Sequence, residues 1–442
     1  MNIFSIFRFP CKGGNIRLEI RTIDSINSFK TIFIALLGNT GLQLFVQVAS
    51  VPLLLHFLGF EQYSLWLIAT NIAQIANILD LGTLASSQNS FTFLARKKQI
   101  TKLINRIKQF WNIILVTYTI TLLAGVFLYF TTDFPVLLAA IFLFSNLIQV
   151  VFGLYEGLTR IENKVAKGLN ASNLLRLVEF LGLILGLFLF EDSIFLIAFG
   201  ALVLKSLAAV VLILRTRNSF RILYFGRFSA IETKELIKEG FPFLMIRVAD
   251  FVMLSGTLLI LQKHFSPVEI VFFVTARTFF RLGLQITSLV NHTYSYSMSS
   301  VWADQNLTQM TSLIKKSQIA TIFLSSIGAI LYLTTGTFLY GIWTHHSMSL
   351  SISLLFLGSI YSAIMSISQG QKTQFNAINL NSRVSYIQLA ISFFQLIITF
   401  VFGASLNVYK MFLSLIFSEC LSLWFVWVLN RDAIKQHFEQ SS

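Results

Sequence analysis

Long apolar runs recur from one end of the 442-residue chain to the other, and polar residues gather mainly between them. The runs are continuous rather than alternating, which predicts helices and argues against the alternating strands of an outer-membrane barrel. Most runs are close to the roughly 20 residues that a helix needs to cross a bilayer. The pattern predicts twelve spans, at 31–57, 62–93, 109–130, 136–157, 173–190, 194–214, 240–262, 268–294, 318–343, 350–370, 384–402 and 408–429.

The composition points to lipid as the solvent of this chain. Apolar residues make up 55% of it and charged residues only 12%, about half of the roughly 25% usual in soluble proteins. The mean hydropathy is +0.74. The most polar internal segment, 215–239, is shorter than the roughly 40 residues that a domain usually needs to fold without staples. We therefore expect an all-α polytopic membrane protein that has no separate catalytic domain.

The distribution of basic residues predicts the orientation in the membrane. The formal net charge of +14 comes from 33 basic and 19 acidic residues, which alone would also suit a nucleic-acid-binding protein. With a cytoplasmic N-terminus, however, 26 of the basic residues fall on the inner side, and only Lys263 and Lys410 fall on the outer side. Because inner loops of membrane proteins carry the excess of Lys and Arg, we expect both termini inside and no nucleic-acid partner.

The loops and termini offer little catalytic chemistry. Residues 1–30 contain no cleavable signal and are expected to lie on the inner surface, with a partner-binding role as the alternative. Cys11 and Cys420 predict no disulfide framework. His345 and His346 have no nearby Cys, Asp or Glu, so we expect no metal site. The short outer loops also disfavour a membrane enzyme, which would need an outer domain to hold its acceptor.

The spans divide into six plus six at the polar segment 215–239. Six spans return the chain to its starting side, so the two halves are expected to share one orientation. The hairpins at the start of each half both run from a small turn residue to an aromatic residue seven positions later. The sequence thus predicts a cytoplasmic N-terminal tail, a first six-helix lobe, a cytoplasmic linker, a second six-helix lobe and a cytoplasmic tail, at 1–30, 31–214, 215–239, 240–429 and 430–442.

Two motifs resemble a known family. The first hairpin, PLLLHFLGFEQYSLW at 52–66 followed by DLG at 80–82, is similar to the opening hairpin of bacterial polysaccharide repeat-unit flippases of the O-antigen type. GFP at 240–242 is similar to the start of their second half. These proteins belong to the multidrug, oligosaccharidyl-lipid and polysaccharide exporter superfamily. The resemblance covers the twelve-span layout and implies two six-helix lobes around a central cavity.

The resemblance also implies a function. The expected cargo is an undecaprenyl-diphosphate-linked oligosaccharide, moved by alternating access across the bacterial inner membrane for O-antigen and lipopolysaccharide assembly. Membrane lipids, a polysaccharide polymerase and a chain-length regulator are the implied partners. No enzymatic activity and no cofactor are expected, although transport would be coupled to a proton or sodium gradient. A related exporter of drugs or other small molecules, and an enzyme of lipid-linked sugar assembly, remain the alternatives.

Polar residues at helical spacing mark a candidate path for the cargo. They recur every three or four residues along single faces of the first, second, seventh and eighth spans. Amides at such spacing also serve as hydrogen bonds between helices, worth roughly 0.6 kcal/mol each, so packing and cargo binding both remain open for them. The uncharged candidates are Asn39, Gln43, Gln47, Gln74, Gln285 and His292.

The charged residues inside spans are the stronger signal. A basic residue at the centre of a span costs roughly 2.5 to 3.5 kcal/mol on insertion scales, so each should face the bundle interior or a wet cavity. Arg277, Arg281 and Arg247 outnumber their acidic neighbour Asp250, which predicts a diphosphate site; a structural ion-pair network is the alternative. Ion coupling and structural roles are both open for Arg176, Glu179, Lys205, Asp80 and Glu419.

The charge asymmetry makes the orientation testable. Reporter fusions that truncate the chain after Thr131 and after Arg227 should place their reporters on opposite sides of the membrane, outside and inside respectively. Activity of an alkaline phosphatase and fluorescence of a green fluorescent protein at each site would measure this. The same side at both positions would refute the predicted topology.

Overall fold

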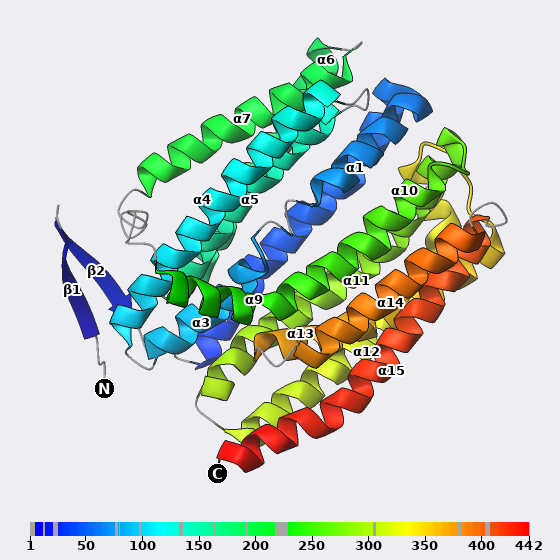
Figure 1. The fold of residues 1–442 in the computed structure, drawn as a ribbon. Helices are drawn as coiled ribbons and strands as arrows, with labels where there is room; N and C mark the ends of the chain where they lie inside the picture. The colour runs from blue at the N-terminus through cyan, green and yellow to red at the C-terminus, as the bar shows by residue number, and fades with distance from the viewer. Residues whose placement is uncertain are drawn as a thin grey trace. The chain divides into compact units, whose positions relative to one another are not determined.

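The computed structural model describes residues 5–11, 14–20, 25–75, 78, 80–96, 99–131, 136–161, 164–190, 193–216, 229–303, 306–378, 382–402 and 407–441. Long helices dominate this part of the chain (Figure 1). Ten of the helices described are long and apolar enough to cross a membrane. The expected fold class, an all-α polytopic membrane protein, is therefore confirmed, and the chain is a multi-pass membrane protein.

The helices follow the predicted spans closely. In chain order they are α1 (Ser25–Ala73), α3 (Thr83–Arg96), α4 (Ile100–Thr131), α5 (Val136–Ile161), α6 (Val165–Leu189), α7 (Ile194–Arg215), α9 (Ala230–Phe251), the π-helical turn η2 (Val252–Gly256), α10 (Thr257–Leu261), α11 (Pro267–Ala303), α12 (Leu307–Trp343), α13 (Ile352–Ala377), α14 (Ser382–Phe402) and α15 (Val408–Ser441). A backbone that bonds within its own segment is the form that an apolar solvent imposes, which is why hydropathy located these elements.

The first two predicted spans are divided differently from the prediction. Helix α1 continues through both, with a kink at Gly59, whose backbone is left-handed at φ 65°. The predicted span 62–93 is then interrupted between α1 and α3, where Gly82 has φ +70°. A Cβ on Gly82 would lie 2.2 Å from the Gly240 carbonyl oxygen, so close packing as well as backbone conformation requires glycine there.

The predicted N-terminal tail contains a small β-hairpin. Strand β1 (Ser5–Cys11) pairs antiparallel with β2 (Gly14–Ile20), with Ser5 opposite Ile20 and Cys11 opposite Gly14. Alternation of apolar and charged residues in 16–21 fits a strand, whose side chains point to opposite faces in turn. The strands lie outside the helical spans.

The chain forms two compact units. The first contains Met1–Asn39 and Ala73–Leu244, and the second contains Thr40–Ile72 and Met245–Ser442. Helices α1 and α9 therefore contribute to both units. Residues 217–228 of the predicted linker lie outside the described residues, whereas 230–239 form the first turns of α9. The predicted domain boundaries stay a prediction.

In the first unit, the start of α9 is fixed onto α3 and α4. Arg106 donates two hydrogen bonds of 2.7 Å to the two carboxylate oxygens of Glu239. Thr233 donates to Gln109 Oε1 at 2.9 Å, and Leu236 packs into a core that includes Phe110. This amphipathic pattern explains why the start of α9 belongs to the first unit although hydropathy alone placed it in a linker.

In the second unit, aromatic rings fill the core between α11, α12, α13 and α15. Phe279 packs edge-on against Phe280, Tyr332 and Tyr340 at centroid distances of 5.2 to 5.5 Å. Phe280 also contacts Phe412 of α15 at 5.6 Å. Such edge-to-face pairs contribute about 0.5 to 1.5 kcal/mol each beyond their buried area.

Gly358 is where this core leaves no spare volume. A Cβ there would lie 2.1 Å from the ring of Phe280, which is itself fully buried. We expect Gly358→Ala to destabilise the protein by about 1 to 3 kcal/mol because the ring must move within a filled core. Thermal unfolding of the detergent-solubilised protein would measure it. Gly328→Ala is the matched control, since its Cβ would meet nothing within 4 Å; equal losses in the two variants would contradict the packing argument.

Candidate functional site

Charged side chains from several helices gather inside the second unit. Helix α11 carries Arg277 and Arg281, α9 carries Arg247 and Asp250, α13 carries Lys372, and α15 carries Glu419. Helix α13 packs against both α11 and α15 (Figure 1). Electrostatic interactions among the charged side chains of these helices show that they lie in one region. We call these six residues, together with Tyr361 of α13 and Gln388 of α14, the charged cluster.

Arg277 is held firmly in place. Its side chain is buried, and Nη1 donates to the Leu254 carbonyl oxygen at 3.2 Å. The guanidinium carbon lies 5.4 Å from the centroid of the Phe273 ring, within cation–π range. Leu254 belongs to the π-helical turn η2, a feature that is frequent at functional sites. Carbonyl and ring together fix the position of a charge that is costly to bury.

Arg281 has an unfilled hydrogen-bonding position. Its Nε is buried and has no hydrogen-bond partner among the described residues. It interacts electrostatically with Asp250, and it repels the like charge of Arg277 four residues earlier. A guanidinium with a buried N–H that lacks an acceptor is suited to bind an anion, whose oxygens would accept that hydrogen bond.

Asp250 lies at the acidic centre of the cluster. Its Oδ1 accepts a hydrogen bond of 3.0 Å from Nε2 of Gln388. The carboxylate also interacts electrostatically with Lys372, Arg281 and Arg247. A single carboxylate is thus shared among several bases, which agrees with the sequence-based picture of Asp250 and adds Lys372 to it.

Lys372 corrects the sequence analysis, which counted it in an inner loop. Helix α13 continues to Ala377, and Lys372 is 3% exposed. Its Nζ lies 3.7 Å from Oε2 of Glu419, which is itself 2% exposed. Its charge ended the apolar run, so hydropathy did not extend the predicted helix to this residue. The helical spacing of Tyr361, Ser368 and Lys372, which places them on one face, was the sequence signal that could have revealed it.

Four polar atoms of the cluster are buried without a hydrogen-bond partner among the described residues. They are Arg281 Nε, the Tyr361 hydroxyl, Glu419 Oε2 and Gln388 Oε1. Tyr361 interacts electrostatically with Arg281, Glu419 and Arg277, so these atoms belong to one neighbourhood. A buried polar group without a partner costs about 1 to 3 kcal/mol, so four such atoms in one neighbourhood mark the cluster as a place where a bound group or water would supply hydrogen bonds.

The predicted uncharged candidates are dispersed. Gln285 Nε2 donates to Gln47 Oε1, which joins α11 to α1 within the second unit, while Gln43, Gln74 and His292 are exposed. Asn39 belongs to the first unit, so the predicted stripe on α1 is divided between units. Asn71, Gln74 and Asn77 follow one helical face of the second predicted span. Asn71 accepts a hydrogen bond of 3.1 Å from the hydroxyl of Ser255 in η2 through its main-chain carbonyl oxygen, and Asn77 lies outside the described residues.

The first unit has its own ion pair between a buried lysine and a half-buried glutamate, and its hydrogen bonds are complete. Lys205 Nζ lies 2.7 Å from Glu179 Oε2 and donates to Ser145 Oγ at 2.7 Å. Ser145 in turn donates to the other oxygen of Glu179. Lys205 is 2% exposed, so it neither snorkels nor lines an open cavity.

Arg176 also has a partner on another helix. Its Nη1 donates to Oδ1 of Asn39 at 2.9 Å, and its charge interacts with Glu156 and Glu179. Arg176 and Glu179, three residues apart on α6, interact electrostatically, while the Glu179 carboxylate bonds to Lys205 and Ser145. Two bases and two acids make this group balanced in charge.

Asp80 caps the start of α3. Its Oδ1 accepts from the Gly82 N–H at 3.0 Å, and its Oδ2 accepts from the Leu84 N–H at 3.2 Å. These are the donors that a helix N-terminus leaves unpaired, and a carboxylate there also interacts favourably with the positive end of the helix dipole. Asp80 is 2% exposed, and these capping contacts give it a structural role.

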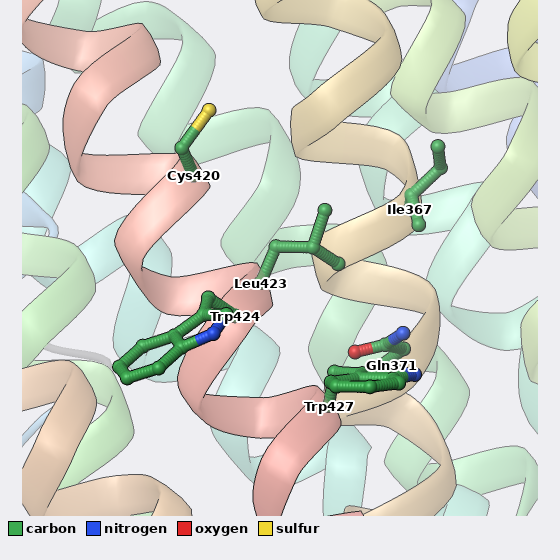
Figure 2. Close-up of a pocket in the computed structure, with 6 residues that line it drawn as sticks. All are labelled: Ile367, Gln371, Cys420, Leu423, Trp424 and Trp427. Atoms are coloured by element: carbon green, nitrogen blue, oxygen red, sulfur yellow. The ribbon is translucent and has the colours of Figure 1, made fainter.

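A shallow pocket of about 350 Å³ lies between α13 and α15. Figure 2 shows Ile367 and Gln371 on one helix, and Cys420, Leu423, Trp424 and Trp427 on the other. Cys420, Trp424 and Trp427 are exposed, so the pocket opens on the outer face of these helices, whereas Lys372 and Glu419 are buried. Its lining is mainly apolar and carries no charged group.

The charge balance separates the two buried groups. In the second unit, the four bases Arg247, Arg277, Arg281 and Lys372 exceed the two acids Asp250 and Glu419. The group around Lys205 in the first unit is neutral. Among the described residues, the charged cluster, unlike the group around Lys205, combines an excess of basic side chains with unfilled hydrogen-bonding positions, and it is the candidate binding site.

Comparisons with known proteins identify the fold. No family model matches the chain, and no curated protein matches its sequence. An outward-facing multidrug resistance MATE family transporter of the MOP superfamily matches with a TM-score of 0.69 and 14% identity, over 94% of this chain and 97% of that one.

Two further solved structures are similar over nearly the whole chain. A MOP superfamily transporter from Pyrococcus furiosus matches with a TM-score of 0.70 and 13% identity, covering 92% of this chain and 95% of that one. The Vibrio cholerae MATE transporter VcmN in its bent form gives 0.63 and 12%, covering 93% and 97%. The chain therefore has the fold of MOP superfamily transporters.

The complete ion pair of the first unit makes a stability prediction. Lys205→Met leaves the Glu179 carboxylate without its base, and we expect a loss of about 1 to 2 kcal/mol, less than for a fully buried pair because the Glu179 side chain is 32% exposed. Lys205→Met combined with Glu179→Gln should recover most of it. Thermal unfolding in detergent measures both, with the exposed Lys167→Met on α6 as control. A double variant as unstable as the single one would refute the pairing argument.

Proposed function

We propose that the chain is a transporter that moves an undecaprenyl-diphosphate-linked oligosaccharide from the inner to the outer leaflet of a bacterial cytoplasmic membrane by alternating access. The observation that carries the proposal is the charged cluster, with four bases against two acids, buried Arg277 and Lys372 among them, and the unfilled Nε of Arg281. A buried charge excess is costly unless an anion of the cargo offsets it. The transporter fold supports movement of a cargo rather than its chemical conversion.

The two arginines would divide the work of binding a diphosphate. Guanidinium presents a planar fork of N–H donors that matches phosphate oxygens. Arg277 already donates to Leu254 and lies against Phe273, so it contributes mainly fixed positive charge. Arg281 has a donor free to bond the anion. Asp250 and Gln388 would orient the bases, and Arg247 would add charge from α9.

The orientation of the proposed transport follows from the basic residues. Both termini would be cytoplasmic, and removing Lys372 from the inner loops leaves the asymmetry against Lys263 and Lys410 almost unchanged. A proton or sodium gradient would drive the cycle.

A multidrug exporter is the second candidate, and the fold favours it directly. Two of the solved structures compared above are MATE transporters, one of them described as a multidrug resistance transporter. The transporter from Pyrococcus furiosus, however, is described as having a binding pocket of reverse polarity that suggests a different function. An excess of buried basic groups in the present chain favours an anionic cargo over cationic drugs.

The proposal predicts unequal effects of the two arginines. Arg281→Ala should reduce export to about a tenth or less, and Arg281→Lys should fall between it and the native chain, because Lys keeps the charge and loses the fork. Export is measured in a deletion strain as surface polysaccharide together with lipid-linked units that accumulate on the inner leaflet. Arg277→Ala should lower transporter abundance as well, because it leaves the Leu254 carbonyl without this donor.

Controls separate the candidate functions. Lys315→Gln removes an exposed charge from α12 and should export normally. Abundance in the membrane is quantified for every variant. Normal export by Arg281→Ala at normal abundance would show that the anion is bound elsewhere. If deletion of the gene stopped synthesis of the lipid-linked unit, the protein would be an enzyme; if the native chain extruded cationic dyes and left the lipid-linked units in place, it would be a drug exporter.

A further inference from the structure

The ion pair of the charged cluster is much looser than the pair in the first unit. Lys372 Nζ and Glu419 Oε2 are 3.7 Å apart, whereas Lys205 and Glu179 are 2.7 Å apart. Charge-assisted hydrogen bonds between an ammonium and a carboxylate usually measure about 2.7 to 2.9 Å. Glu419 Oε2 has no hydrogen-bond partner among the described residues. Both groups are buried, so the pair accepts the desolvation penalty without the compensating bond.

The surroundings show what else could hold these charges. Lys372 is the first of the bases that act on Asp250 of α9, ahead of Arg281 and Arg247. Glu419 interacts electrostatically with Tyr361 of α13, and Tyr361 also interacts electrostatically with Arg281 and Arg277 of α11. Gln388 of α14 bonds Asp250. The Lys372–Glu419 pair is thus continuous with the two arginines, and Glu419 lies within electrostatic reach of the proposed anion site.

We propose that Lys372 is a further basic contact for the anionic group of the cargo, and that Glu419 is an internal counter-ion that pairs with Lys372 only while no cargo is bound. This inference rests on the proposed function and assigns the regulation of its binding site. The cargo's phosphate oxygens supply acceptors to Arg281 Nε and to the ammonium of Lys372. Glu419 opposes the arriving anion by repulsion and replaces it on departure.

The proposal fixes the sign of each substitution. Glu419→Gln removes a negative charge that competes with the ligand, so anion binding should tighten. Lys372→Gln removes an attractive charge, so binding should weaken. By Coulomb's law at an effective dielectric constant of about 20, one unit charge in the site changes a binding constant by roughly tenfold or more. The double variant loses one attractive and one repulsive charge, so its affinity should lie between those of the two single variants.

Inorganic pyrophosphate is the probe, because it presents the charge of a diphosphate without lipid or sugar. Isothermal titration calorimetry of the full-length protein in lipid nanodiscs, at constant ionic strength, would measure its dissociation constant. We expect roughly tenfold tighter binding for Glu419→Gln and roughly tenfold weaker binding for Lys372→Gln. Matched controls in the same unit are Glu269→Gln, an exposed carboxylate at the start of α11, and Lys315→Gln, which should both bind as the native chain does.

A transport assay separates competition from simple charge loss. Glu419→Gln should export less than the native chain despite its tighter binding, because the counter-ion that promotes release is absent. If either single variant unfolds, Lys372→Arg and the charge-free double variant keep the test open. Lys372→Arg keeps the base and should bind within a few-fold of the native chain. The double variant should retain the native melting temperature and bind more weakly than Glu419→Gln but more tightly than Lys372→Gln, whichever of the two folds.

Opposite results would overturn the inference in distinguishable ways. If Glu419→Gln leaves pyrophosphate affinity unchanged or weakens it at native stability, Glu419 is no counter-ion and the pair is structural. If Arg281→Ala abolishes binding while the Lys372 and Glu419 variants bind normally, this inference fails and the proposed function stands. If the native chain itself does not bind pyrophosphate, the proposed diphosphate site fails.

Discussion

The cost of placing charge in an apolar solvent governs what this chain does with its buried ionisable groups. Such a charge is retained when a partner and hydrogen bonds offset its lost hydration. The first unit meets this condition within itself: Lys205, Glu179 and Ser145 bond to one another, and Arg176 bonds to Asn39. The second unit does not, because Arg281 Nε and Glu419 Oε2 have no hydrogen-bond partner among the described residues. The same constraint thus produces a structural cluster in one unit and a receptive one in the other.

Irregular backbone appears where the second unit needs a particular contact. The π-helical turn η2 provides the Leu254 carbonyl to Arg277 and the Ser255 hydroxyl to Asn71. In the first unit, the left-handed Gly82 allows the α3 turn to approach the Gly240 carbonyl, and Asp80 satisfies the N–H groups that this turn exposes. Each departure from a regular helix therefore replaces the lost backbone bonding with a specific contact.

Hydropathy was sufficient to predict the helices because apolar solvent forces the backbone to bond within each segment. It failed where tertiary contacts decide. The turn at Asp80 and Gly82 depends on Gly240, which is remote in sequence, and the helical Lys372 was mistaken for a loop residue because its charge ended an apolar run.

The site was predicted only as a set of residue types. Spacing brought Arg277 and Arg281 onto one face, but the sequence gives no means of telling that Leu254 and Phe273 restrain the first while the second keeps a free donor. The partner of Lys205 was equally hidden, because Glu179 lies on another helix. Pairings between helices depend on rotation and depth, which periodicity within one helix does not determine.

If the charged cluster binds an anionic cargo as proposed, it must also release that cargo, and these two requirements would account for its incomplete pairing. Fully paired charges, as around Lys205, would leave nothing for an anion to bind. Unopposed bases would bind it too strongly to release it, since an interaction made equally throughout a cycle only deepens the bound state. Two acids among four bases lie between these limits. The loose contact of 3.7 Å between Lys372 and Glu419 is where the balance is most easily shifted, because little bonding is lost when an incoming anion separates the pair.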